Sequence, residues 1–63
     1  MTIGEKIKSR RKELGFSAEV IAEKLGVSPA TIYRYESGDI RNIRSSLIVP
    51  LTRILRMDPT ELF

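Results

Sequence analysis

Apolar residues recur at helical spacing along most of this 63-residue chain, in segments that are separated by glycine. In the first segment they form one stripe that begins at Ile3 and ends at Leu14. Gly15 then supplies the left-handed residue that ends many helices. Thr2 and Glu5 fit a capping box, in which each side chain pairs with an amide that the first turn leaves free. The pattern predicts a helix from about Ile3 to Leu14.

A second helix is predicted over residues 18–25. Ser17 is its candidate N-cap residue, because a serine oxygen can accept a hydrogen bond from an amide of the first turn. Gly26 follows the last apolar residue and marks the end of the helix. The apolar face consists of Ile21, Ala22 and Leu25.

A third helix is predicted over residues 29–37, with Gly38 at its end. Ser28 precedes Pro29, which fits an N-cap followed by proline at the first helical position, where a missing N–H costs nothing. At about 100° per residue the segment separates into two faces. The inner face carries Ser28, Thr31, Ile32, Tyr35 and Glu36, and the outer face carries Pro29, Ala30, Tyr33, Arg34 and Ser37. The outer face has no core to join, so we expect it to face solvent or a partner.

The remaining chain predicts a loop and two further helices. Residues 39–46 lack a helical period and form a polar loop, with Ile40 and Ile43 turned inward. Leucines and isoleucines at helical spacing predict a helix from about residue 47 to 56, in which Pro50 belongs in the first turn. A cap, a proline and a glutamate recur at residues 58–61 and predict a final short helix. Met57, Leu62 and Phe63 are expected to fill the core or an interface. The fold class is therefore all-α, a compact bundle of about five short helices.

Composition excludes several classes of protein. The chain has no cysteine and no histidine, which excludes a disulfide scaffold, thiol chemistry, a zinc finger and a histidine acid or base. Glu19 and Glu23 form an i,i+4 carboxylate pair, but no nucleophile or set of metal ligands accompanies them, so we expect solvated side chains. We therefore predict no catalytic residue, no metal site and no cofactor. The chain is not expected to be an enzyme.

Charge and hydropathy say less about the partner. Eleven Lys and Arg residues against 8 Asp and Glu residues make the chain mildly basic, which bears on non-specific partners rather than on fold. The longest apolar run is Leu47 to Val49, far short of a membrane span, and the N-terminus lacks the apolar stretch of a secretory signal. These observations predict a cytoplasmic protein without a membrane partner.

Two opposite charges lie on inward-facing positions. Arg11 falls on the apolar stripe of the first helix, between Ile7 and Leu14, and Glu36 lies beside Ile32 on the inner face of the third helix. Charged side chains are rarely buried unless they are paired. We therefore predict a structural salt bridge between Arg11 and Glu36.

The segment from Ala18 to Ser37 resembles the helix-turn-helix of the phage-repressor-like (XRE-type) family, which includes the lambda and 434 repressors. Ala22 stands where the first helix of that motif packs closely, Gly26 in its turn, and Ile32 in the middle of its second helix. Ile21, Leu25, Val27 and Tyr35 occupy the other apolar positions of the motif. The similarity extends through "IGEKIKSRRKELGFSAEVIAEKLG" before the motif, "YESG" at its end and "LTRILRMDPTELF" near the C-terminus, so it covers essentially the whole chain.

This resemblance implies one DNA-binding domain over residues 1–63. Because "VSPATIYRYESGDI" is similar to the DNA-binding half of two-domain repressors, one expectation is that the chain is the N-terminal fragment of a longer repressor. The implied partner is double-stranded DNA, bound at a near-palindromic operator by a homodimer. No small-molecule ligand is evident.

The resemblance also implies which residues touch DNA. Arg34 can bond the O6 and N7 atoms of guanine, Pro29 and Ala30 can contact a thymine methyl group, and Tyr33 can meet a phosphate or the groove wall. Candidate phosphate contacts are Ser17, Ser28, Arg10, Arg41, Asn42 and Arg44. Other repressors often carry glutamine near positions 29 and 30 and at position 18, where this chain has Pro29, Ala30 and Ala18. Specificity is therefore expected to depend on Arg34, Tyr33 and the shape of the DNA.

Several alternatives to a repressor stay open. The same fold serves antitoxins and restriction-control regulators, which also bind DNA. A protein-interaction module that keeps the helices and has lost DNA binding belongs to a different class. For the arginines of residues 39–46, a solvated loop without a partner is the alternative, and Ser17 and Ser28 can act as local caps alone.

Overall fold

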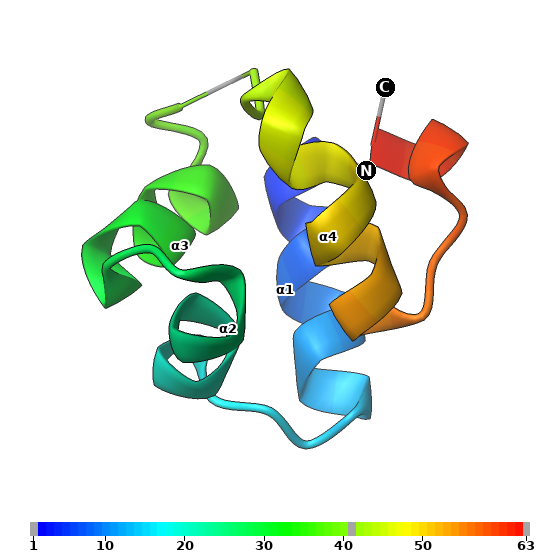
Figure 1. Cartoon of the computed structure of the whole chain (residues 1–63). Helices are drawn as coiled ribbons and strands as arrows, with labels where there is room; N and C mark the ends of the chain where they lie inside the picture. The colour runs from blue at the N-terminus through cyan, green and yellow to red at the C-terminus, as the bar shows by residue number, and fades with distance from the viewer. Residues whose placement is uncertain (1, 41, 63) are drawn as a thin grey trace.

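The structure is a computed structural model that describes residues 2–40 and 42–62, and within them it contains helices and no strand. The elements are α1 (Ile3–Glu13), α2 (Ala18–Leu25), α3 (Pro29–Ser37), α4 (Ser45–Leu55) and a 3-10 turn, η1 (Pro59–Leu62). In Figure 1, α1 runs behind α4, while α2 and α3 lie together on one side of this pair and η1 on the other. The all-α prediction is confirmed.

The core receives side chains from every element. The buried apolar residues are Ile7, Ala18, Ile21, Ala22, Ile32, Tyr35, Ile43, Leu51, Leu55 and Leu62. Ile43 is the inward-turned residue that was predicted for the loop between α3 and α4, and Leu62 fills the core as expected. Ile40 and Met57 are partly buried and pack against this cluster. Phe63 lies outside the described residues.

Local caps set the beginnings of α1 and α2, but the capping box predicted for α1 is present only in part, because the Glu5 carboxylate pairs with the Thr2 hydroxyl rather than with an amide. The Glu5 amide donates to the Thr2 hydroxyl oxygen at 3.2 Å, and that hydroxyl donates to the Glu5 carboxylate at 3.1 Å. The Val20 amide donates to the Ser17 hydroxyl oxygen at 3.1 Å. Gly26 ends α2 with a φ of 76°, a backbone conformation that costs glycine little because it has no Cβ.

The last segment corrects the count of five helices. Residues 59–62 form a single 3-10 turn, so the described chain has four α-helices. The predicted capping pattern is nevertheless present, because the Thr60 amide donates to the Asp58 carboxylate at 2.9 Å and the Asp58 amide donates to the Glu61 carboxylate at 3.0 Å. These two bonds lower the conformational freedom of the turn, and burial of Leu62 holds it on the domain.

The prediction for α4 was wrong at its start. The helix begins at Ser45 rather than near Leu47, so Pro50 lies inside the helix instead of in its first turn. Proline has no N–H and leaves the Ser46 carbonyl without its helical donor. Ser46 is exposed, so water can replace the missing donor, which explains why the helix tolerates the proline.

Gly4 allows α1 and α3 to approach each other directly. A Cβ atom at this position would lie 2.3 Å from the Tyr35 carbonyl oxygen and 2.7 Å from the Glu36 carbonyl oxygen. Both atoms belong to the backbone of α3, which cannot move aside as a flexible side chain can. The contact fixes the position of α3 against α1, and with it the direction of the outer face of α3.

Candidate nucleic-acid interface

Helix α3 has the two faces that its sequence predicts. Ile32 is fully buried and Tyr35 is 5% exposed, whereas Tyr33, on the other side, is 49% exposed. All five predicted residues of the outer face, which we call the α3 outer face, are exposed: Pro29, Ala30, Tyr33, Arg34 and Ser37. Ser28 differs from the prediction, since it is exposed although it was placed on the inner face. It precedes the first helical residue, so the helical angle does not set its direction.

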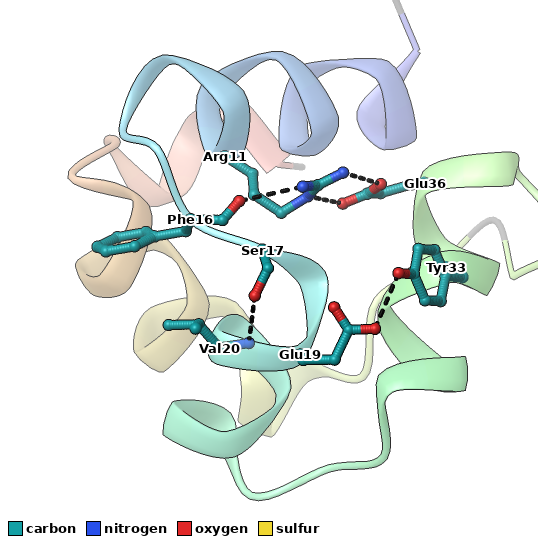
Figure 2. A network of polar contacts seen from close by, with 7 residues as sticks. All are labelled: Arg11, Phe16, Ser17, Glu19, Val20, Tyr33 and Glu36. Carbon is teal, nitrogen blue, oxygen red and sulfur yellow. Dashed lines mark hydrogen bonds and ion pairs between the residues drawn. The ribbon is translucent and has the colours of Figure 1, made fainter.

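The expected salt bridge between Arg11 and Glu36 is present on the inner side of α3, where it joins α1 to α3 (Figure 2). The guanidinium uses two nitrogens on one carboxylate, with Nε–Oε2 at 2.7 Å and Nη2–Oε1 at 3.0 Å. A third nitrogen, Nη1, donates to the Phe16 carbonyl oxygen at 3.1 Å. The bond to Glu36 raises the pKa of Arg11, and burial opposes this effect. The pair ties α1, α3 and the segment before α2 together.

The turn between α2 and α3 is fixed by the backbone. The Gly26 and Val27 amides both donate to the Ala22 carbonyl oxygen, at 2.9 Å and 3.0 Å. Two amides on one carbonyl, together with the left-handed Gly26, close the end of α2 and set the direction in which the chain enters α3. The turn therefore fixes the angle between α2 and α3, and with it the direction in which the α3 outer face points.

Arg34 is the cationic side chain of the α3 outer face. It is exposed, and within residues 2–40 and 42–62 its side chain makes no hydrogen bond or ion pair. A guanidinium with its donors available and its helix held rigidly can bond both acceptors of a guanine edge. Pro29 and Ala30 lie exposed at the N-terminal end of the same face, where they offer only apolar contact.

Tyr33 is engaged within the molecule, which the sequence did not predict. Its hydroxyl donates to the Glu19 carboxylate of α2 at 3.0 Å (Figure 2). This hydrogen bond raises the pKa of Tyr33, and the negative charge of Glu19 adds to the effect. Glu19 was treated as a solvated residue, yet its carboxylate lies at the border between α2 and the α3 outer face.

The two candidate serines begin adjacent helices but differ in their bonding. Ser17 caps α2 through its side chain, whereas Ser28 makes no side-chain cap bond and instead pairs with the Thr31 hydroxyl at 3.2 Å. Both serines are exposed. Amides and the positive end of a helix dipole at such positions favour anions.

Of the predicted loop residues, Asn42 and Arg44 are exposed between α3 and α4. Arg41 lies outside the described residues, so its predicted phosphate contact stays a prediction.

Arg10 is engaged within the molecule, and its predicted phosphate contact stays a prediction. Its guanidinium donates to the Leu55 carbonyl oxygen at 2.8 Å, the Arg56 carbonyl oxygen at 3.3 Å and the Glu13 carboxylate at 3.0 Å. Arg56 ends α4 in the left-handed conformation, with a φ of 55°, where the sequence supplies no glycine. Arg10 thus satisfies carbonyl groups that the end of α4 leaves free, and these three bonds use three of the five N–H donors of its guanidinium.

Residues 7–62 match the sequence model of the helix-turn-helix family, which covers most of the chain. The chain is a member of this family. The resemblance predicted from residues 18–37 is therefore confirmed. We call this chain the helix-turn-helix domain below.

Two curated relatives are named as HTH-type transcriptional regulators. The helix-turn-helix domain is 33% identical over 60 residues to the HTH-type transcriptional regulator DicA of Escherichia coli, covering 95% of this chain and 44% of that protein. It is 46% identical over 37 residues to an HTH-type transcriptional regulatory protein of Pyrobaculum aerophilum, covering 59% of this chain and 15% of that protein. The chain thus spans less than half the length of either relative.

Three solved structures share the fold. The P22 c2 repressor in complex with a synthetic operator is 25% identical with a TM-score of 0.92, over 100% of this chain and 94% of that one. SinR in complex with DNA is 30% identical with a TM-score of 0.88, over 97% of each chain. The restriction-modification controller protein C.AhdI from Aeromonas hydrophila is 30% identical with a TM-score of 0.84, over 97% of this chain and 91% of that one.

The described residues contain neither a metal-binding group of side chains nor a membrane-spanning helix. Within residues 2–40 and 42–62, no three acidic side chains come together in a way that could hold a metal ion. In the same part of the chain, no helix is long and apolar enough to cross a membrane.

Three residues acquire roles that sequence reasoning missed: Gly4, Arg10 and Glu19. A glycine inside a helical pattern is itself a signal of close packing, so Gly4 could have been singled out. Arg10 and Glu19 each meet a partner on another helix, and no local pattern contains that partner.

Proposed function

We propose that the helix-turn-helix domain binds double-stranded DNA in a sequence-specific manner as a transcriptional regulator of the phage-repressor type. In this proposal α3 enters the major groove and α2 crosses the phosphate backbone. The exposed guanidinium of Arg34 on a rigidly held helix is the observation that carries the proposal. The relatives that are transcriptional regulators, and the neighbours solved with an operator or with DNA, support it.

The exposed side chains divide into proposed base contacts and proposed phosphate contacts. Arg34 would bond guanine, and Pro29 and Ala30 would contact a thymine methyl group. Ser17 and Ser28, at the beginnings of α2 and α3, would meet phosphates, as would Asn42 and Arg44 beyond α3. Arg10 stays a candidate phosphate contact through the two N–H groups that its bonds at the end of α4 and to Glu13 leave unused.

Selection of bound sites from random duplexes, at a stated salt concentration, tests the proposal most directly. The expected result is one enriched, near-palindromic sequence, bound with an affinity that falls steeply with salt. A domain that enriches no sequence and ignores duplexes in dilute buffer would contradict it. That outcome would favour the protein-interaction module.

Arg34→Ala should weaken binding to the selected duplex by about 1–3 kcal/mol and relax the preference at one base pair. Lys12→Ala is the matched control, because Lys12 is an exposed cation on α1 outside the proposed interface. Fluorescence anisotropy titrations of both variants against selected and shuffled duplexes provide the comparison. Equal losses for the two variants would mean that Arg34 acts only through net charge.

We also propose that two copies bind together on DNA. A single module of this size supplies a small contact area, and pairing over adjacent half-sites is the usual way to increase it. Sedimentation of the domain with and without the selected duplex tests this point. A complex that holds one copy at saturating protein would count against a dimer.

A restriction-control regulator is the second candidate function. The 30% identity to the controller protein C.AhdI supports it. Both candidates bind DNA, so the binding experiments above do not separate them. The identity of the genes beside the selected site would.

A further inference from the structure

The hydrogen bond between Tyr33 and Glu19, which we call the clasp, joins α2 to the α3 outer face. The Tyr33 hydroxyl and the Glu19 Oε2 atom are 3.0 Å apart, and both residues are exposed. Glu19 stands two positions after Ser17, in the first turn of α2. The clasp therefore places the Glu19 carboxylate next to two candidate DNA-contacting residues, Ser17 at the start of α2 and Tyr33 on the α3 outer face.

A free carboxylate at this place would oppose DNA binding. Phosphates approaching the start of α2 would meet the negative charge of Glu19, and like charges a few ångströms apart repel each other even in water. A carboxylate in the first turn also competes with a phosphate for the positive end of the helix dipole. The direction of this one side chain thus affects how well the start of α2 can accept a phosphate.

The clasp decides that direction. In Figure 2 the Glu19 carboxylate is turned toward Tyr33, while the Ser17 side chain faces the Val20 amide on the other side of the helix start. A phenol has a single proton to donate, and Tyr33 gives it to Glu19. A phenol is protonated at neutral pH, and the bond raises the pKa of Tyr33 further above its ordinary value of 10.0.

We propose that Tyr33 acts on DNA binding through Glu19, as a positioning residue that holds this carboxylate against α3 and away from the phosphate at the start of α2. The inference rests on the proposed function. It assigns to Tyr33 a different role from the direct DNA contact that the sequence suggested. It also makes Glu19 a side chain that limits affinity.

Three variants test the clasp: Tyr33→Phe, Glu19→Gln and the double variant. Phenylalanine keeps the ring and removes the donor, while glutamine keeps an acceptor for Tyr33 and removes the charge. Anisotropy titrations use a labelled duplex from the selection above and a shuffled duplex of the same composition. We expect Tyr33→Phe alone to weaken binding by roughly fivefold and Glu19→Gln alone to strengthen it by roughly fivefold.

The double variant carries the decisive result. Once the charge is gone, loss of the Tyr33 donor should change affinity less than twofold relative to Glu19→Gln, on both duplexes. An equal loss in the two backgrounds would overturn the inference, because it would mean that the Tyr33 hydroxyl bonds DNA directly. Unchanged or weaker binding by Glu19→Gln would also overturn it.

Glu23→Gln is the matched control. Glu23 is an exposed carboxylate one turn further along α2, and its removal changes net charge by the same amount. We expect it to change affinity less than Glu19→Gln, and an equal gain would overturn the inference in favour of net charge alone. If the unaltered domain selects no duplex, the proposed function itself fails. If it selects a duplex and the effects of the two substitutions on affinity are simply additive, only the clasp fails.

Discussion

Helix α3 carries a glutamate-containing contact on each side, and the two contacts differ mainly in burial. On the inner side the Glu36 side chain is 5% exposed and its Arg11 partner 12% exposed. On the outer side Tyr33 is 49% exposed where it meets Glu19. The closest atoms are separated by 2.7 Å inside and 3.0 Å outside, so distance does not distinguish the pairs.

Burial changes what each pair contributes. A buried charge is no longer hydrated and is stabilised by its ion-pair partner. Removal of that partner leaves the charge with neither water nor a counterion, which lowers the stability of the fold. An exposed group recovers water when its partner is removed, so the contact adds little to folding. The comparison therefore assigns the inner pair to stability and the outer pair to the proposed DNA-binding surface. Three substitutions test this division, from the largest expected effect to the smallest.

Glu36→Ala should destabilise the domain by about 3–5 kcal/mol, because it leaves the Arg11 guanidinium buried without a counterion. Small domains of this length have a free energy of unfolding of roughly 3–9 kcal/mol. The variant is therefore expected to lose a large share of its stability, and circular dichroism during urea denaturation would detect the loss as a lower midpoint. An unchanged midpoint would show that the inner pair does not support the fold.

Gly4→Ala tests the close contact on the same side of α3. Alanine favours helix over glycine, so the substitution would stabilise an isolated α1. Here the new Cβ would meet two α3 carbonyl oxygens, and we expect a net loss of about 1–3 kcal/mol from overpacking. Thermal denaturation provides the measurement, with Lys8→Ala at an exposed α1 position as control. A gain in stability would mean that α3 can move away from α1 at little cost.

Tyr33→Phe should lower the free energy of unfolding only slightly, and by less than either substitution above, because its hydroxyl is exposed and recovers water. The pH dependence sharpens the same point. The pKa of Tyr33 is raised above its ordinary value of 10.0, so the clasp is complete below that pH and is lost as pH rises through the raised pKa. An NMR titration of the Tyr33 ring should show the raised pKa, and Glu19→Gln should lower it. An identical titration in Glu19→Gln would contradict a bond to this carboxylate.

The sequence predicted the helices well where local rules act alone. The bounds of α2 and α3 agree with the prediction, because a serine and a glycine delimit each helix and the apolar period lies between them. The prediction failed at α4, where the start depends on how the preceding loop packs and an internal proline is tolerated because its missing bond faces water. At residues 59–62 the caps were predicted, but the tight 3-10 geometry was not.

The candidate site divides in the same way. Helical periodicity alone separates the inner from the outer face of α3, and it brings Arg11 and Glu36 toward each other because both fall on buried stripes. Helical periodicity cannot predict which exposed side chains form hydrogen bonds between two helices. Arg10 at the end of α4 and Glu19 beside Tyr33 are determined by interhelical distance and angle, which no local spacing contains.

By itself the sequence determined α1, α2 and α3, their ends and the direction of their apolar faces, since these depend on backbone conformation and on interactions within a few residues. Only the tertiary structure decided which polar side chains remain free for a partner. The approach of α1 to α3 at Gly4 and the angle between α2 and α3 bring distant residues together, and those contacts engage Arg10 and Tyr33 while Arg34 stays exposed.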